Sequence, residues 1–188
     1  MTAQSDATIT TARLELRTMT ADFLEATLFG DLTRAEELGG FTLSEDWPGE
    51  SPRLLRHWID ALRADPAREP WTARAIVQRS DGLMAGHIGF HDRPGAAYLE
   101  QWAPGANAVE IGYTVFARHR MLGYATEAAA GLMDWAWLRH GVDRFIASVS
   151  PDNAPSLRVV AKLGFVRIGS HMDEVDGPED VFERRVPS

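Results

Sequence analysis

The segment at 120–126 has the residue types and spacing of an anion-binding turn. Gly123 and Ala125 are small, and they stand after a strand-like segment at 109–115 and at the start of a long helical pattern. Small side chains let successive backbone N–H groups converge on one point, and the positive end of the helix dipole adds to the attraction for anions. The spacing predicts a site for a phosphate or a pyrophosphate. Alone, so short a pattern more often marks an ordinary strand-to-helix turn than a binding site.

A second motif begins the next helical segment. After an apolar, β-branched run at 145–149, the chain reads Asn-Ala-Pro-Ser-Leu-Arg from Asn153 and closes with Lys-Leu-Gly-Phe at 162–165. Asn153 is a favourable helix N-cap, and Ser156 is compatible either with capping or with a hydrogen bond to a ligand. The two motifs together predict two walls of one binding cleft.

Both motifs, in this order, resemble the GNAT superfamily of N-acetyltransferases. The acyl-CoA-binding motif of that family reads Arg or Gln, two residues, Gly, one residue, then Gly or Ala. Arg120, Gly123 and Ala125 match it. The family also places a strand, an Asn-x-x-Ser helix and a Lys-Leu-Gly-Phe ending after this loop. The chain departs from the family at Met121, where a small Gly is usual.

The resemblance covers about residues 8–186 and implies a fold. It looks closest to the ribosomal-protein N-terminal acetyltransferase branch, because Glu-Ile-Gly-Tyr at 110–113 precedes the loop. The implied fold is α/β (α+β), with a mixed, mostly antiparallel central sheet that has a V-shaped split and is flanked by helices. Acetyl-CoA is the implied acyl donor, and no metal is implied.

The resemblance also implies roles for residues along the split. Backbone donors of a bulged strand from Tyr113 to Val115 would polarise the thioester oxygen. Ser156 would protonate the departing sulfur or bind the pantetheine arm, because Val160 stands where many relatives have a Tyr. The cofactor-binding residues expected on this basis are Tyr113, Val115, Arg120, Met121, Leu122, Gly123, Tyr124, Ala125, Thr126, Asn153 and Ser156.

The acceptor amine must lose a proton, so a base is needed near it. Glu110 is the first candidate, acting directly or through water, because the family often places a carboxylate at the start of this strand. A solvent-facing strand position is the alternative for Glu110. His87 and His91, which share a face of the preceding strand, are alternative bases. Trp47, His87 and Glu110 are the residues expected to contact the amine, Trp47 through a cation–π interaction.

Composition narrows the class of protein. The 188 residues contain 45% hydrophobic residues, enough for the core of one domain over 1–188, and no Cys, which excludes a disulfide scaffold and a thiolate nucleophile. A net charge of -8 argues against general nucleic-acid binding. Neither an apolar leader at the N-terminus nor an apolar run of about 20 residues is present, so we expect a cytoplasmic protein without a membrane partner.

The predicted activity is direct transfer of an acetyl group from acetyl-CoA to a primary amine, in a ternary complex. The acceptor would be a protein N-terminus or a small amine. An antibiotic or polyamine acetyltransferase is the alternative within enzymes, and a non-catalytic acyl-CoA sensor is the alternative from another class. A homodimer is compatible with the sequence, because terminal strands can pair across a two-fold axis.

Periodicity and turn residues predict the elements that position these groups. A hairpin turn is expected at 80–82, and irregular loops at 41–49 and 93–107. Helices are expected to begin at 20 and at 51 and to cover 33–38, 123–139 and 154–163, and strands are expected at 9–18, 73–78, 84–91, 109–115, 144–150, 166–170 and 180–185.

Overall fold

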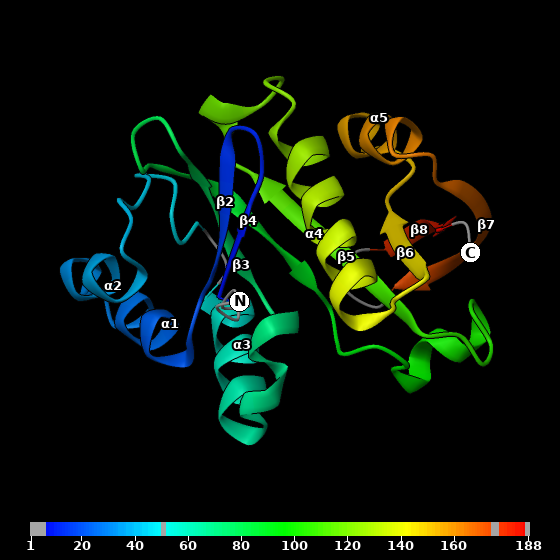
Figure 1. Cartoon of the computed structure of the whole chain (residues 1–188), viewed down its shortest axis with the longest axis horizontal. Coiled ribbons are helices and arrows are strands. Elements are labelled where there is room, and N and C mark those ends of the chain that lie inside the picture. The colour runs from blue at the N-terminus through cyan, green and yellow to red at the C-terminus, as the bar shows by residue number, and fades with distance from the viewer. Residues whose placement is uncertain (1–6, 50–51, 174–176, 187–188) are drawn as a thin grey trace.

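The computed structural model describes residues 7–49, 52–173 and 177–186, and Figure 1 shows the order of its elements. The strands are β1 (Thr8–Thr10), β2 (Leu14–Thr18), β3 (Arg74–Gln78), β4 (Met84–Phe90), β5 (Ala108–Val115), β6 (Arg144–Val149), β7 (Val166–Asp173) and β8 (Gly177–Arg185). The helices are α1 (Ala21–Leu28), α2 (Leu32–Gly39), α3 (Pro52–Ala64), α4 (Tyr124–His140) and α5 (Ala154–Lys162), with short 3₁₀ turns η1 (Pro66–Trp71), η2 (Ala97–Gln101) and η3 (Ala117–His119).

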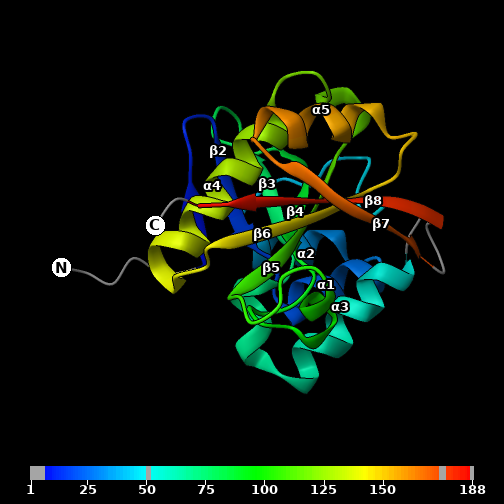
Figure 2. The same cartoon turned by 90° about the vertical axis from the view of Figure 1, so that its right-hand side faces the viewer.

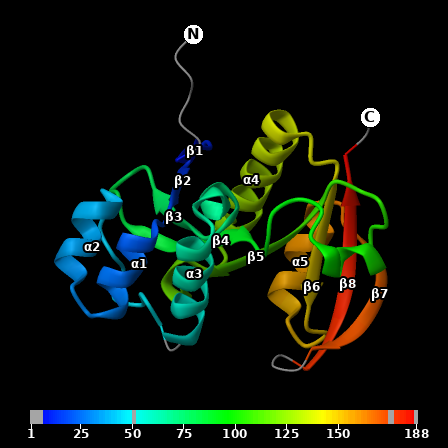
Figure 3. The same cartoon turned by 90° about the horizontal axis from the view of Figure 1, so that it is seen from below.

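One sheet of eight strands runs in the order β1-β2-β3-β4-β5-β6-β8-β7. Its pairs are antiparallel except for β5 and β6, which are parallel. The predicted mixed, mostly antiparallel sheet is therefore confirmed. In Figure 3 strands β1–β4 and strands β6–β8 lie on opposite sides of β5. The parallel pair of β5 and β6 is thus the place where the two parts of the described sheet join.

Helices cover both faces of the sheet. Figure 2 shows α5 above the strands and α1–α3 below them. The lower face of the sheet is covered in part by α3, whose apolar side chains Leu55, Ile59 and Leu62 are buried at helical spacing. On the other face, Leu132 and Met133 of α4 pack into the larger apolar cluster. Each layer of helices therefore has its own core, with the sheet between them.

The first strand differs from the prediction of one strand at 9–18. It is a hairpin in which β1 and β2 pair antiparallel, with Thr8 opposite Arg17. The turn forms because Thr11 N–H donates to the Leu14 carbonyl at 2.9 Å and the Leu14 N–H donates back to Thr11 Oγ1 at 3.1 Å. Arg79 donates to two carbonyls of the same turn. Threonine side chains offer the backbone this local alternative to an extended strand.

The remaining elements follow the predicted order with small shifts of their ends. The terminal strands are longer than expected, and short 3₁₀ turns occupy parts of the predicted loops. The expected cap at Ser51 lies outside the described residues. Within the ranges that the structure describes, no helix has both the length and the apolar character that crossing a membrane demands.

Candidate functional site

The sheet splits next to Glu110. Strand β5 pairs with β6 only from Ala108 to Glu110, which is opposite Ile146. Its pairing with β4 continues to Val115. We call the Glu110–Ile146 pair the fork. Beyond the fork the β6 side of β5 has no strand partner among the described residues. Glu110 bonds β4 through its carbonyl, so the backbone groups of Ile111, Tyr113 and Val115, which alternate with it, point away from β4 and toward a cleft.

The prediction of a bulge from Tyr113 to Val115 is wrong. The register between β4 and β5 is continuous from Phe90 opposite Ile111 to Gly86 opposite Val115. The backbone of β5 is instead freed because β6 diverges from it. A shift of register does occur, but one strand further away, between Ile76 and Val77 of β3.

A cleft of about 520 Å³ lies between α4 and α5, and we call it the α4–α5 cleft. It brings together ten of the eleven predicted cofactor-binding residues, and Leu122 is the exception: its side chain is half exposed and its carbonyl accepts a hydrogen bond from Arg13. The lining residues are Tyr113, Thr114, Val115, His119, Arg120, Met121, Gly123, Tyr124, Ala125, Thr126, Asn153, Pro155, Ser156, Arg158, Val159 and Lys162.

The start of α4 is suited to an anion. Its N-cap is Gly123, with φ of 82°, and no side chain of the described residues caps the first turn. The other α-helices whose starts are described are capped by Thr20, Asp31 and Asn153. The first N–H groups of a helix lack partners within the helix, so at α4 they are left for a ligand. Phosphate oxygens would satisfy them.

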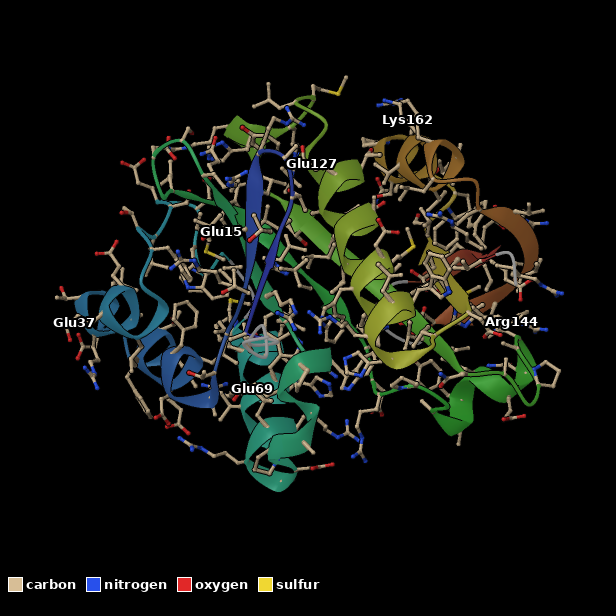
Figure 4. All side chains as sticks on the ribbon, viewed as in Figure 1. Glu15, Glu37, Glu69, Glu127, Arg144 and Lys162 are labelled. Atoms are coloured by element: carbon tan, nitrogen blue, oxygen red, sulfur yellow. The ribbon has the colours of Figure 1, made fainter. Side chains whose placement is uncertain are left out.

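Cationic side chains also line the α4–α5 cleft. Arg120 donates from Nε to the Val115 carbonyl at 3.1 Å, so it also fixes the end of β5. Arg158 and Lys162 line the α5 wall, and Figure 4 shows the Lys162 side chain projecting outward from that helix. Arg118 is engaged elsewhere, because it pairs with Glu45 at 2.7 Å. In a protein of net charge -8, this cluster of positive charge favours an acidic ligand.

Met121 is the one described residue other than Gly with positive φ, at 63°. This left-handed conformation costs a non-glycine residue about 1–2 kcal/mol. The side chain is 86% exposed, so its size does not close the cleft. The chain thus keeps the backbone shape that a Gly would adopt more readily at this position.

The middle of the cleft holds two hydroxyl groups. Asn153 caps α5 by accepting the Ser156 N–H at 3.2 Å, which fixes the position of Ser156. The Tyr113 phenol lies beside Ser156; burial raises its pKa, and the hydroxyl of Ser156 partly offsets that rise. The sequence suggested only the backbone of Tyr113. Its side chain reaches Ser156 because β5 and α5 meet in the tertiary structure, whereas Val160 is buried in the core.

Glu110 is held by several donors at the fork. Its Oε1 accepts from Ser148 Oγ at 2.6 Å, and Oε2 lies 3.4 Å from His91 Nδ1. Burial by itself raises the pKa of Glu110, but hydrogen bonds from His91, Ser148 and Tyr98 and the charge of His91 outweigh burial and lower it. The group is therefore a carboxylate at neutral pH. Ser148 gave no signal in the sequence, since it is one small polar residue in a strand.

The His91 ring lies over Gly112. A Cβ at Gly112 would come within 2.7 Å of His91 Nε2, so the absence of a side chain there makes room for the imidazole. The His91 side chain is 55% exposed, whereas that of Glu110 is 9% exposed. His91 thus connects the buried carboxylate with solvent on the strand face away from α4.

The structure separates the other two residues expected to contact the amine from Glu110. His87 lies between the rings of Trp47 and Trp58, at centroid distances of 5.9 and 5.3 Å. Trp47 is 4% exposed and donates its indole N–H to Thr27 at 3.3 Å, so it belongs to the core under α1. His87 is four residues from His91 along β4, which corresponds to about 13 Å.

Burial lowers the pKa of His87 to about 4, which leads to a prediction for acid stability. The unfolded chain binds a proton there near pH 6.5 and the folded chain does not, so His87 destabilises the fold progressively as the pH falls from 6.5 to 4. The protein loses unfolding free energy between pH 7 and pH 4, and we expect His87→Gln to make this loss smaller by about 3 kcal/mol, since one pKa unit corresponds to about 1.4 kcal/mol. Urea unfolding at pH 7 and at pH 4 measures the unfolding free energy of wild type and variant. His57→Gln, on the exposed side of α3, is the control, and equal losses for wild type and His87→Gln would contradict the prediction.

Comparisons with known proteins agree with this geometry. Residues 13–166 match the family model described as an acetyltransferase (GNAT) domain. The uncharacterised N-acetyltransferase YjdG of Bacillus subtilis is 28% identical over 157 residues, covering 83% of this chain and 88% of that protein.

Two solved structures show the same fold. RimJ of Mycobacterium smegmatis, in complex with CoA-disulfide, superposes with a TM-score of 0.62 at 22% identity, over 95% of this chain and 87% of that one. The ribosomal-protein-S5-alanine acetyltransferase of Vibrio fischeri gives a TM-score of 0.62 at 14% identity, over 95% of this chain and 96% of that one. With the split sheet, the uncapped start of α4 and a family match over most of its length, this chain belongs to the GNAT family of acetyltransferases.

Proposed function

We propose that the protein transfers the acetyl group of acetyl-CoA directly to a primary amine held in a ternary complex. The observation that carries the proposal is the position of Glu110, a buried carboxylate at the fork. The α4–α5 cleft opens beyond this point. A donor that lies along β5 in the cleft would therefore bring its acyl group toward the same place that Glu110 serves.

The residues of the cleft fit the parts of acetyl-CoA. The N–H groups of the first turn of α4 would bind the pyrophosphate, and Arg158 and Lys162 would bind the nucleotide's remaining phosphate. The N–H groups of Tyr113 and Val115 that point away from β4 would hold the pantetheine arm and polarise the carbonyl oxygen. Bound acetyl-CoA supplies a thioester carbon open to attack and a thiolate leaving group.

Two pairs of side chains would move protons. Glu110 would act as the base for the amine, directly or through water, with His91 as the group that connects it to the exposed face. Ser156 would donate to the departing sulfur or hold the pantetheine arm, and Tyr113 beside it supplies a second protonated hydroxyl. Because burial raises the pKa of Tyr113, its phenol stays protonated at neutral pH and able to donate.

The amine that we propose first is the N-terminus of a protein. Two structural neighbours, from Vibrio fischeri and Salmonella typhimurium, are described as acetyltransferases of ribosomal proteins S5 and L7/L12. A small amine, such as a polyamine or an amine antibiotic, is the second candidate, because the acidic protein would attract a cationic acceptor.

The test has two stages. Calorimetric titration with acetyl-CoA measures donor binding, and we expect micromolar affinity. Release of free thiol is then followed with peptides that begin with Ala or Ser, with spermidine, and with an aminoglycoside. Thiol release with peptides alone supports the first candidate, and release with the cations alone supports the second. Binding without thiol release from any amine would identify an acyl-CoA sensor instead, and no binding would overturn the proposal.

A further inference from the structure

The loop that precedes α4 is held from behind by the hairpin of β1 and β2. Arg13, in the turn of that hairpin, forms an ion pair with Glu127 in the first turns of α4, with 2.7 Å between Nε and Oε2. The same guanidinium donates from Nη1 to the Leu122 carbonyl at 2.9 Å. Figure 4 shows Glu127 between the end of the hairpin and the start of α4. One side chain therefore joins the hairpin, the helix and the loop.

The Leu122 carbonyl is the informative contact. In a trans peptide the C=O and the following N–H point in opposite directions. When Arg13 holds the Leu122 oxygen on the hairpin side, the N–H of Gly123 must point to the opposite side. Gly123 lines the α4–α5 cleft. The hydrogen bond to Leu122 thus aims the first N–H of the anion site into the cleft.

The orientation of Arg13 is itself strongly determined. Glu127 Oε1 accepts from the Arg13 N–H and from Thr11 Oγ1, both at 2.7 Å. The guanidinium also lies 4.9 Å from the centre of the Tyr124 ring, whose phenol donates to Gln78 at 2.9 Å. Arginine can make these contacts together because its guanidinium is planar and carries five N–H donors in fixed directions. A lysine has one ammonium group and cannot serve Glu127 and Leu122 with the same geometry.

We propose that Arg13 is a positioning residue for the donor site: braced by Glu127, it orients the Leu122–Gly123 peptide so that Gly123 N–H binds the pyrophosphate of CoA. This inference rests on the proposed function for the identity of the ligand. It predicts an effect on binding that is separable from charge and from overall stability. The role differs from direct phosphate binding, because the guanidinium acts through the backbone.

The test compares Arg13→Gln and Arg13→Lys with wild type. We expect both variants to weaken CoA binding at least tenfold in calorimetric titrations, since neither reproduces the two directed bonds. In nitrogen–proton correlation spectra, CoA should shift the Gly123 amide proton downfield in wild type and clearly less in both variants. An orientation effect moves this resonance, whereas a general loss of stability does not.

Arg79→Gln is the matched control. Arg79 donates from Nη1 to the carbonyls of Thr11 and Ala12 at 3.0 and 2.9 Å, so it stabilises the same turn. It also carries the same charge as Arg13. We expect Arg79→Gln to lower the melting temperature and to keep CoA affinity within about twofold of wild type, the scale of a surface change away from the ligand.

Each other outcome has a defined meaning. Wild-type affinity in Arg13→Gln overturns the inference, and wild-type affinity in Arg13→Lys alone shows that only the charge matters. Equal losses of CoA affinity in the Arg13 and Arg79 variants would show that the stability of the turn controls binding, and they also overturn the inference. If wild type binds CoA but no amine is acetylated, the proposed transfer fails while this inference is still decided by the variants. If wild type does not bind CoA, both fail.

Discussion

Ala125→Asp is expected to weaken CoA binding at least about 100-fold while leaving the protein as stable as wild type or more so. Ala125 is in the first turn of α4 and lines the α4–α5 cleft. A carboxylate there would accept the same N–H groups that the pyrophosphate needs, and it would repel the phosphates. Two like charges about 4 Å apart cost up to about 4 kcal/mol near a protein surface. About 2.8 kcal/mol of this already corresponds to a 100-fold loss.

Ala125→Asp is expected to weaken CoA binding but not to lower the stability of the protein, so the two effects can be told apart. An acidic residue in the first turn stabilises a helix by about 0.3–1 kcal/mol through the dipole, so unfolding cannot explain lost binding. Ala125→Asn is the control of nearly identical shape and no charge, and we expect it to weaken binding about tenfold or less. Calorimetry with CoA and thermal unfolding provide both readouts. Equal affinities for the Asp and Asn variants would show that the phosphates do not bind at this helix end.

Glu110→Gln is expected to lower kcat by about 100-fold to 1,000-fold, within the range for loss of a general base. The change keeps the shape of the side chain, but an amide cannot take a proton from the amine. CoA affinity should stay within about threefold, because the carboxylate lies at the fork, and its donors Ser148, His91 and Tyr98 lie outside the residues that line the α4–α5 cleft. Steady-state kinetics with saturating acetyl-CoA measure the first effect, and calorimetry measures the second.

The controls for this variant follow from its contacts. An amide facing Ser148 leaves one buried donor without an acceptor, which costs about 1–3 kcal/mol of stability, so the assay must be run well below the melting temperature. Ser148→Ala removes that donor and keeps the carboxylate; we expect a loss of kcat of tenfold or less. Full turnover of Glu110→Gln would show that Glu110 is not the base. A large loss in His91→Gln as well would then assign the base to His91.

Much of the fold was predictable because its signals are local. Gly, Pro and capping residues mark the ends of helices, and apolar residues recur at the helix or strand period. The hairpin of β3 and β4 and helices α4 and α5 therefore fall where the sequence places them. The single strand expected at 9–18 is wrong because the side chain of Thr11 closes a turn with Leu14. Alternation of residue types does not reveal such a turn.

The prediction of a bulge in β5 was also wrong, for a different physical reason. The resemblance associates free backbone groups at Tyr113 to Val115 with a bulge. In this chain the N–H groups of Tyr113 and Val115 lack a strand partner because β6 leaves β5 after Glu110, while β6 stays paired with β8 as far as Val149. The pairing of whole strands is a property of the complete sheet. No pattern within β5 encodes it.

The turn before α4, the family resemblance and most of the order of elements could be inferred from the residues alone, because backbone conformation over a few residues depends on nearby side chains. The surroundings of Glu110 and of the loop before α4 became apparent only in the folded molecule. Arg13 contacts Glu127 across 114 positions, and Ser148 reaches Glu110 across 38. Such partners meet only after the strands and helices pack, since many spacings along the chain are compatible with one contact in space. The environment of Glu110 and the orientation of the loop therefore belong to the folded molecule.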